Sequence, residues 1–207
     1  MQIKQLTIGW MSLGDSYFDL AEYEKAVEYL NKSLECHSTN ISINEWYGQI
    51  WDKLGDSYSK LDMLDKSVEC YHKAIEFYSK MNPEDKNALG GLATVYAKLN
   101  DYDKASEYLN KIKELYPAEF QKFKGISSSS VIAVILIESN QYDKAIEYCN
   151  KILEQNPENG DAWAILAMTY MKLGNTEKVL DCLHKALEFN SKIILAAGGN
   201  WNVLGER

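Results

Sequence analysis

The sequence predicts an all-α protein built from stacked pairs of helices. Three observations predict this class: a segment that recurs every 34 to 41 residues, apolar residues spaced as on one face of a helix, and prolines confined to the ends of the repeats. Because a helix pair of this size cannot bury its apolar face alone, the copies are expected to stack on one another. Five copies are found, starting at Thr7, Gly48, Lys86, Ile126 and Gly160.

The first helix of each copy is marked by four recurring positions, counted from these starts. Position 8 is always small, and the spacings between positions 4, 7, 8 and 11 place their side chains on one helix face. Position 4 is aromatic in three copies, position 7 is Leu or Ile throughout, and position 11 is Tyr in four copies. The small residues are Gly14, Gly55, Ala93, Ala133 and Ala167.

A second helix follows in each copy, most clearly in the segment Glu22–Leu34. Position 20 is small in four copies, whereas position 24 carries Leu, Tyr or Cys. Small side chains at positions 8 and 20 let the paired helices approach closely, and larger ones fill the space around the contact. The three prolines, Pro83, Pro117 and Pro157, lie near copy ends, where a helix must stop or start.

These residues resemble the tetratricopeptide repeat, a helix-turn-helix unit. The resemblance implies one domain over residues 1–207, folded as a right-handed α-solenoid with repeats 7–40, 48–81, 86–119, 126–159 and 160–193. Two residues of the fourth copy, Ser129 and Leu136, depart from the aromatic pattern. Residues 198–207, which include Trp201, repeat the opening of a first helix. We interpret them as part of a sixth repeat of a longer array, or as a short cap.

Three junctions between copies carry local signals. Ser42 and Glu45 form a capping box that predicts an early start, near Ile43, for the second copy's first helix. The segment Asn82–Asp85 offers an N-cap followed by a proline at the first helical position. The insert Phe120–Gly125 ends in glycine and precedes four serines, which predicts a local break.

Charge and composition exclude several classes of function. The net charge of −8 and a single arginine disfavour nucleic acid, whose phosphates require a basic face. No signal peptide or membrane-spanning run is present, and the four cysteines lack metal-ligand spacing, so we expect a reduced, cytoplasmic setting without a cofactor or metal. Acids at positions 18 and 22 and a lysine at position 26 recur in every copy, which predicts a solvated outer stripe.

No pattern indicates an enzyme. The Gly-Asp-Ser-Tyr phrase, at Gly14 and Gly55, resembles a hydrolase nucleophile block, but its serines are expected inside helices, away from the sharp turn that such a nucleophile needs. The segment Ala88–Ala93 lacks the lysine and serine of a phosphate loop. We therefore predict no catalytic residue.

The resemblance also implies a concave groove lined by positions 2, 5, 9, 12 and 13 of the first helices. Its early part is acidic and its late part apolar, so we expect a protein or peptide partner with basic and apolar segments, rather than an acidic tail. The candidate groove residues are Met11, Asp15, Phe18, Asp19, Gln49, Asp52, Asp56, Asn87, Thr94, Val134, Ile137, Met168 and Met171.

Three questions stay open from the sequence. Gly90 and Gly91 cost helix stability, and close approach of a ligand, neutral drift or a later helix start each account for them. The chain is expected to act as a non-catalytic interaction scaffold, but the apolar late groove also allows a homo-oligomer. A regulatory domain belonging to a larger enzyme or peptide-sensing receptor is the third alternative.

Overall fold

The computed structural model describes residues 2–36, 44–120 and 127–189, and within them the chain forms helices and turns without a strand. The predicted all-α class is confirmed. The predicted cap at Ser42, most of the insert after Phe120 and the expected partial repeat 198–207 lie outside the described residues. The chain divides into two compact units, residues 1–116 and residues 117–207, each of which is considered by itself.

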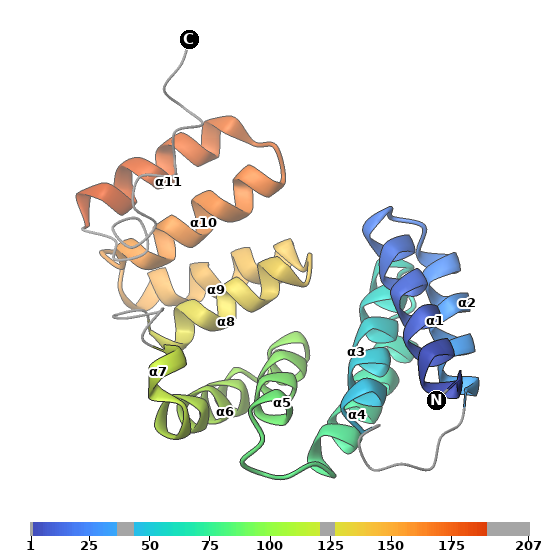
Figure 1. Ribbon diagram of the computed structural model, residues 1–207. Helices are drawn as coiled ribbons and strands as arrows, with labels where there is room; N and C mark the ends of the chain where they lie inside the picture. The colour runs from blue at the N-terminus through green and yellow to red at the C-terminus, as the bar shows by residue number, and fades with distance from the viewer. Residues whose placement is uncertain (1, 37–43, 121–126, 190–207) are drawn as a thin grey trace. The chain divides into compact units, whose positions relative to one another are not determined.

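Unit 1 contains three helix pairs (Figure 1). The first pair is α1 (Gln2–Asp19) with α2 (Tyr23–Glu35), the second is α3 (Asn44–Lys60) with α4 (Leu64–Ser79), and the third is α5 (Lys86–Lys98) with α6 (Tyr102–Leu115). Each second helix also packs on the next first helix, α2 on α3 and α4 on α5. The first helices contact one another, so α1, α3 and α5 form one layer.

Unit 2 repeats this arrangement after the single turn α7 (Pro117–Phe120). Its pairs are α8 (Ser128–Glu138) with α9 (Tyr142–Gln155), and α10 (Gly160–Lys172) with α11 (Thr176–Glu188). Helix α10 packs on both α9 and α8, as the first helices of unit 1 do on their neighbours. The Ser127 hydroxyl caps α8 by accepting a hydrogen bond from the Ser130 backbone N–H at 3.1 Å.

The small residues allow the close helix approach that their spacing predicts. Position 8 is buried in all five copies, and a Cβ added to Gly55 would lie 2.5 Å from Cε1 of Tyr71, so no larger side chain fits. A Cβ added to Gly14 would likewise lie 2.6 Å from Cγ of Leu30. The position-20 residues are also buried, from Ala26 at 0% exposure to Val179 at 5%. Packing therefore explains these two glycines of the Gly-Asp-Ser-Tyr phrases.

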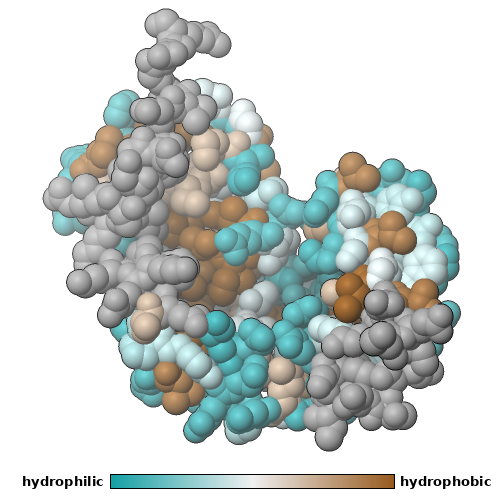
Figure 2. Space-filling model, in the orientation of Figure 1, coloured by the Kyte–Doolittle hydropathy of each residue, from teal (hydrophilic) through white to brown (hydrophobic). Residues whose placement is uncertain are grey.

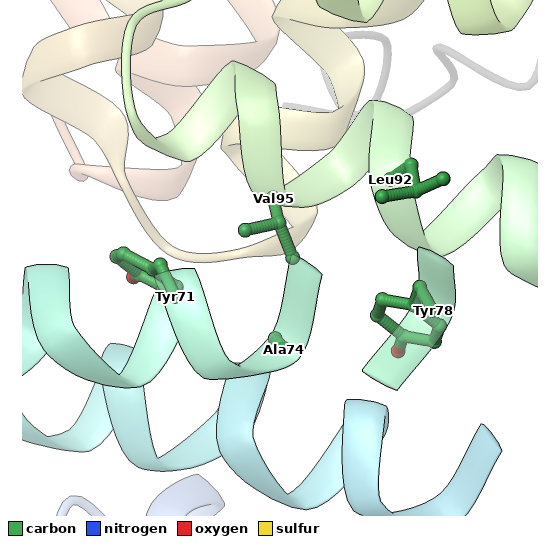
Figure 3. Packing of buried hydrophobic residues seen from close by; sticks show 5 residues of the cluster. All are labelled: Tyr71, Ala74, Tyr78, Leu92 and Val95. Carbon is green, nitrogen blue, oxygen red and sulfur yellow. The ribbon is translucent and has the colours of Figure 1, made fainter. Parts of the chain in front are cut away.

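Apolar side chains from three consecutive helices form the core of each junction. Between α4 and α5, Tyr71, Ala74 and Tyr78 pack against Leu92 and Val95 (Figure 3). The preceding junction holds the buried residues Leu30 of α2, Ile50 and Leu54 of α3, and Cys70 of α4. Because both of these junctions use the next copy's first helix, stacking completes a core that one pair leaves open.

Two local features depart from the pattern of the other repeats or from the sequence prediction. Leu13 occupies position 7, which is buried in the other four copies, but it is 41% exposed because no second helix precedes α1 within the described residues. The third copy's first helix begins at Lys86 rather than Pro83. Asp85 is its cap, with one carboxylate oxygen accepting hydrogen bonds from the backbone N–H groups of Asn87 and Ala88 at 2.9 and 3.0 Å.

The turn between the paired helices has the same backbone conformation in every copy, although the residue types at this turn differ. Position 15 has a positive φ in every copy, between 56° and 71°. This region suits glycine and, less well, Asn or Asp, because other side chains clash with the backbone there. The residues are Ala21, Asp62, Asn100, Asn140 and Gly174.

Candidate functional site

The first helices of unit 1 carry polar side chains that the packing between helices does not bury completely. We call the following set the unit 1 face: Met11, Asp15, Asp19, Gln49, Asp52, Asn87, Gly90 and Thr94. Asp19, Gln49 and Asn87 are exposed, and the other members are half-buried. Two predicted groove residues of this unit lie deeper, because Phe18 and Asp56 are each 4% exposed. These two contribute to packing rather than to an accessible surface.

A buried ion cluster joins α3 to α5 beneath the unit 1 face. The Lys98 Nζ lies 2.7 Å from Oδ1 of Asp52 and 2.8 Å from Oδ2 of Asp56. The Tyr71 hydroxyl of α4 donates a hydrogen bond of 2.8 Å to the other oxygen of Asp56. Asp52 and Asp56, two of the four aspartates expected to attract a basic partner, therefore form ion pairs with an internal lysine. The charge of Lys98 reduces the net negative charge of the unit 1 face.

Burial sets the protonation of this cluster. Loss of water raises the pKa of Asp52 to about 6, and the nearby Asp56 adds to the shift, while Lys98 opposes it. Burial alone would lower the pKa of Lys98, but attraction to the two carboxylates outweighs it and the pKa lies above its ordinary value. Lys98 therefore stays charged, and the Asp52 carboxylate, whose side chain is 19% exposed, is incompletely compensated.

At the start of the unit 1 face, Asp15 is still open to a partner. Its nearest cation is Lys53 of α3, whose Nζ lies 3.9 Å from Oδ1 of Asp15 and 4.7 Å from the centre of the Phe18 ring. Burial raises the pKa of Asp15, and the charge of Asp19 raises it further. This end of the face keeps two carboxylates against one loosely placed lysine, so it remains acidic.

The Tyr78 ring passes between α3 and α5 from the layer of second helices. A Cβ added to Gly48 would lie 2.6 Å from Cε1 of Tyr78, and one added to Gly91 would lie at the same distance from that atom. Both glycines are therefore required by the ring. This settles one of the open questions, because Gly91 is explained by packing against Tyr78, which is 4% exposed.

Gly90 is different from its neighbour. A Cβ built at Gly90 meets no atom within 4 Å, and the residue is half-buried on the unit 1 face. No contact within the described chain requires a glycine there, although glycine in a helix interior costs about 1 kcal/mol relative to alanine.

The first helices of unit 2 carry an apolar set, which we call the unit 2 face: Val134, Ile137, Met168 and Met171. Val134 and Met168 are half-buried, Ile137 is 5% exposed, and Met171 is 43% exposed. Figure 2 shows hydrophobic atoms gathered over the part of unit 2 where Figure 1 draws α8 and α10. The first helices therefore carry polar side chains in unit 1 and apolar side chains in unit 2. Ile137 is more deeply buried than the other three residues of the unit 2 face.

The outer stripe is more structured than its charges alone predict. The position-26 lysines of three copies lie over the position-4 tryptophans, with Lys185 Nζ 4.0 Å from the centre of the Trp163 ring. The position-19 lysines of four copies lie over the position-11 tyrosines, as Lys178 does over Tyr170 at 4.8 Å. The expected pairs of an acid and a lysine four residues later also form, as between Glu28 and Lys32.

The serines of the Gly-Asp-Ser-Tyr phrases hold ordinary helical positions. The Ser16 hydroxyl donates to the Ser12 carbonyl oxygen at 2.8 Å, and the Ser57 hydroxyl donates to the Lys53 carbonyl oxygen at 2.9 Å. Both bonds run one turn back along the same helix, and Ser57 is fully buried. Neither serine stands on the sharp turn that would present a nucleophile.

Comparison with known proteins agrees with this geometry. Models of the tetratricopeptide repeat match residues 9–35, 46–118 and 136–193, which together are more than half of the chain. YrrB, described as a TPR protein with an unusual peptide-binding site, is 23% identical over 94% of this chain and 91% of its own, with a TM-score of 0.42. A MamA structure is 18% identical over 91% of this chain and 94% of its own, with a TM-score of 0.41. No curated protein matches.

The stacked pairs and their shared small positions define a helical-repeat protein of the α-solenoid class. The chain belongs to the tetratricopeptide repeat family. Repeats of this kind support a role as a protein–protein interaction scaffold. Within the described residues, no helix is both long enough and apolar enough to cross a bilayer.

Proposed function

We propose that this chain is a non-catalytic scaffold that binds a peptide or helical segment of a partner protein on its first helices. The observation that carries the proposal is the difference between the two faces. The unit 1 face exposes Asp19, Gln49 and Asn87, whereas the unit 2 face exposes Met171 and half-exposes Met168. The stacked core uses none of the three exposed polar side chains as a packing contact.

The unit 1 face is suited to a basic segment. Lys53 lies 3.9 Å from Asp15, so a partner's cations would add attraction at Asp15 and the exposed Asp19 without displacing a strong internal pair. Exposed charges steer a partner over a distance comparable to the Debye length, and salt weakens the effect. Gln49 and Asn87 supply donors and acceptors for a partner backbone.

The unit 2 face is suited to an apolar segment. Methionine is unbranched and adapts its shape to different partners, and Met168 and Met171 lie one turn apart on α10. An amphipathic helix that places its apolar side against such a surface removes it from water. A single partner could carry both kinds of segment, or two partners could carry one each.

The experiment uses two fluorescein-labelled peptides, one of alternating lysine and alanine and one amphipathic leucine-rich helix. Asp15→Asn combined with Asp19→Asn should weaken binding of the lysine peptide at low ionic strength, and added salt should narrow the difference. The matched control is Asp65→Asn with Asp103→Asn, which removes the same charge from exposed second-helix positions of unit 1. Equal affinity of the lysine peptide for both double variants would contradict the proposed role of Asp15 and Asp19 in binding.

The apolar half is tested in the same titration with the leucine-rich peptide. Met171→Glu should weaken its binding, while Leu180→Glu, a change of equal polarity at a 41% exposed residue of α11, should not. Because both side chains are already partly in water, neither change buries a charge. Equal affinities for the two variants would contradict an apolar site on α10.

Self-association is a second candidate, favoured by exposed leucines on the outermost described helices. Leu6 and Leu13 of α1 are 52% and 41% exposed, and Leu187 of α11 is 58% exposed. In a repeat stack these positions are those that a further helix would cover. Light scattering at two concentrations tests this candidate: a mass that rises with concentration and falls in Leu13→Glu supports it, and a constant monomer mass contradicts it.

The setting in which the scaffold acts follows from the same proposal. All four cysteines are free, and Cys70, Cys149 and Cys182 are buried among apolar side chains. This supports a reduced, cytoplasmic compartment. A regulatory role within a larger enzyme or receptor is compatible with the same two faces, and the partner's identity would distinguish it from a free-standing scaffold.

A further inference from the structure

We infer that the Asp15 carboxylate and the Phe18 ring of α1 form a site for one arginine side chain of the partner, and that Lys53 of α3 occupies this site until the arginine displaces it. The inference rests on the proposed function, because it specifies which cation the unit 1 face binds and where. Three observations carry it: the geometry of the resident lysine, its weak hold on Asp15, and its place at a repeat position where the other copies carry no charge.

A cation already lies in this site. Asp15 and Phe18 are about one turn apart on α1, so their side chains share a face of the helix. The Lys53 Nζ reaches across from α3 and lies 3.9 Å from Oδ1 of Asp15 and 4.7 Å from the centre of the Phe18 ring. A carboxylate attracts a cation through its charge, and the face of an aromatic ring attracts it through its quadrupole. The two groups therefore form a cation site whose present occupant comes from the chain itself.

A contact that does not involve Lys53 holds the Phe18 ring. The ring is 4% exposed and packs edge-to-face against Tyr23 of α2, with the two ring centroids 5.4 Å apart. Aromatic rings prefer this arrangement, so the pair fixes the orientation of the Phe18 ring. When the Lys53 ammonium leaves, the ring face stays in position for another cation. The site is therefore organised before its ligand arrives, which lowers the entropic cost of binding.

Lys53 is held weakly, as a comparison with the buried lysine of the same unit shows. The Lys98 Nζ lies 2.8 Å from Asp56, and those two side chains are 3% and 5% exposed. Lys53 and Asp15 are 3.9 Å apart, which is too far for a hydrogen bond, and their side chains are 32% and 42% exposed. An exposed ion pair of this kind contributes little to stability, so its loss costs little. The flexible stem of Lys53 lets the ammonium move into water.

The repeat pattern does not require a lysine at this position. Lys53 occupies position 6 of the second copy, and the residues at position 6 of the other copies are small or apolar: Ser12, Gly91, Val131 and Ile165. Four copies therefore stack without a charged side chain at this place. The lysine of the second copy corresponds to the carboxylate and the ring on α1 rather than to the packing that the copies share.

An arginine suits this site better than the lysine that occupies it. A guanidinium is planar, donates two parallel hydrogen bonds to a carboxylate and stacks on an aromatic face. Burial raises the pKa of Asp15 despite the charge of Lys53, which shows that the resident lysine does not fully compensate this carboxylate. Asp19, about one turn further along α1, is exposed and adds attraction for a cation. The geometry therefore favours a partner segment that carries arginine.

The test titrates the whole chain at low ionic strength with three fluorescein-labelled peptides, in which alanine alternates with arginine, with lysine or with citrulline. The arginine peptide should bind more tightly than the lysine peptide, and the uncharged citrulline peptide should not bind. Lys53→Met removes the competing cation and should raise the affinity for the arginine peptide about fivefold, as expected for one charge about 4 Å away in water. Equal binding of the arginine and citrulline peptides would contradict a cation site.

Lys66→Met is the matched control, because it removes the same charge from α4, where the Lys66 Nζ lies 5.4 Å from the centre of the Tyr58 ring. It should change the affinity much less than Lys53→Met does. The gain from Lys53→Met should also disappear in an Asp15→Asn background, which lacks the carboxylate that the first change sets free. Equal gains in Lys53→Met and Lys66→Met, or a gain that persists without the Asp15 carboxylate, would overturn the displacement of Lys53.

The displacement itself is read from the NMR signal of the Lys53 methylene group next to Nζ, which is assigned by its loss in Lys53→Met. The nearby Phe18 ring shifts this signal away from the position of exposed lysines, and saturation with the arginine peptide should return it there. A signal that stays unchanged while the peptide binds would exclude the displacement. The proposed function would then still stand if Asp15→Asn combined with Asp19→Asn weakens binding of the lysine peptide.

Discussion

Lys98 and Asp56 form an ion pair between consecutive repeats, with Nζ and Oδ2 separated by 2.8 Å and the two side chains 3% and 5% exposed. The pair links residues 42 positions apart and fixes α5 against α3. The helices it joins carry Asp52 and Asn87 of the unit 1 face, so the stability of this cluster and the shape of that face are coupled.

Removing the lysine of this pair should be costly. Lys98→Met leaves two buried carboxylates without their cation and should lower the free energy of unfolding by about 3–5 kcal/mol. Urea denaturation measures the loss. The comparison variant is Lys111→Met, whose ion pair with Glu107 at 2.7 Å lies on the exposed stripe and should have little effect. Equal, small changes for both variants would contradict the stabilising role of the buried cluster.

The Asp52 carboxylate predicts a specific pH dependence. Because its folded pKa is about 6, above the ordinary value of 3.8, the folded state binds the proton more tightly than the unfolded state between these values. The contribution of Asp52 to stability therefore grows as the pH falls from 6 toward 4, by up to about 1.4 kcal/mol per pH unit.

The measurement is the difference in unfolding free energy between the wild type and Asp52→Asn at several pH values. The unfolding free energy of the wild type should increase relative to that of the variant as the pH falls through 6, because asparagine does not titrate. A difference that stays constant between pH 4 and pH 7, or one that changes in the opposite direction, would show that burial does not raise the pKa of this residue.

Adjacent glycines of α5 should respond oppositely to the same substitution. Gly91→Ala places a Cβ 2.6 Å from Tyr78 Cε1, so a buried ring must move, and overpacking of this kind costs about 1–3 kcal/mol. Gly90→Ala meets no atom within 4 Å and should stabilise the helix by about 1 kcal/mol. Thermal unfolding of the two variants checks the signs. Destabilisation by Gly90→Ala would contradict the open space assigned to it.

The first inter-helix turn should be improved by a single glycine. Ala21 has a φ of 57°, a conformation that costs a residue with a Cβ about 1–2 kcal/mol, and Gly174 occupies the equivalent turn of the fifth repeat. Ala21→Gly should raise the unfolding free energy by about 1 kcal/mol, less the entropy that glycine adds to the unfolded chain. Gly174→Ala is the reciprocal variant and should destabilise. Changes of the same sign in both would be inconsistent with this turn geometry.

The sequence predicted the elements that depend on periodicity. Positions 8 and 20 are small for a steric reason that acts within each pair, so the sequence alone assigns Gly14 and Ala26 to the contact. Leu13 departs from this pattern because burial at position 7 depends on a preceding second helix, and none packs on α1 within the described residues. Periodicity records what a residue usually contacts, and it does not record whether that neighbour is present.

The site was less predictable because it depends on contacts between copies. Asp56 shares a helix face with Asp52, but nothing in the spacing shows that Lys98 of the next repeat reaches both. Tyr78 was not singled out, since a tyrosine at a position without a repeat pattern carries no signal of its own. A usable signal existed for the outer face: lysine at position 19 accompanies tyrosine at position 11 in the four copies that form the contact.

The most direct test of this account is the affinity of the lysine and alanine peptide for the wild type and for the Asp15→Asn, Asp19→Asn double variant, measured side by side at low ionic strength. The account predicts saturable binding by the wild type and weaker binding by the variant, with a difference in affinity that added salt narrows. Identical affinities, or a difference that salt leaves unchanged, would contradict an acidic binding surface on the first helices of unit 1.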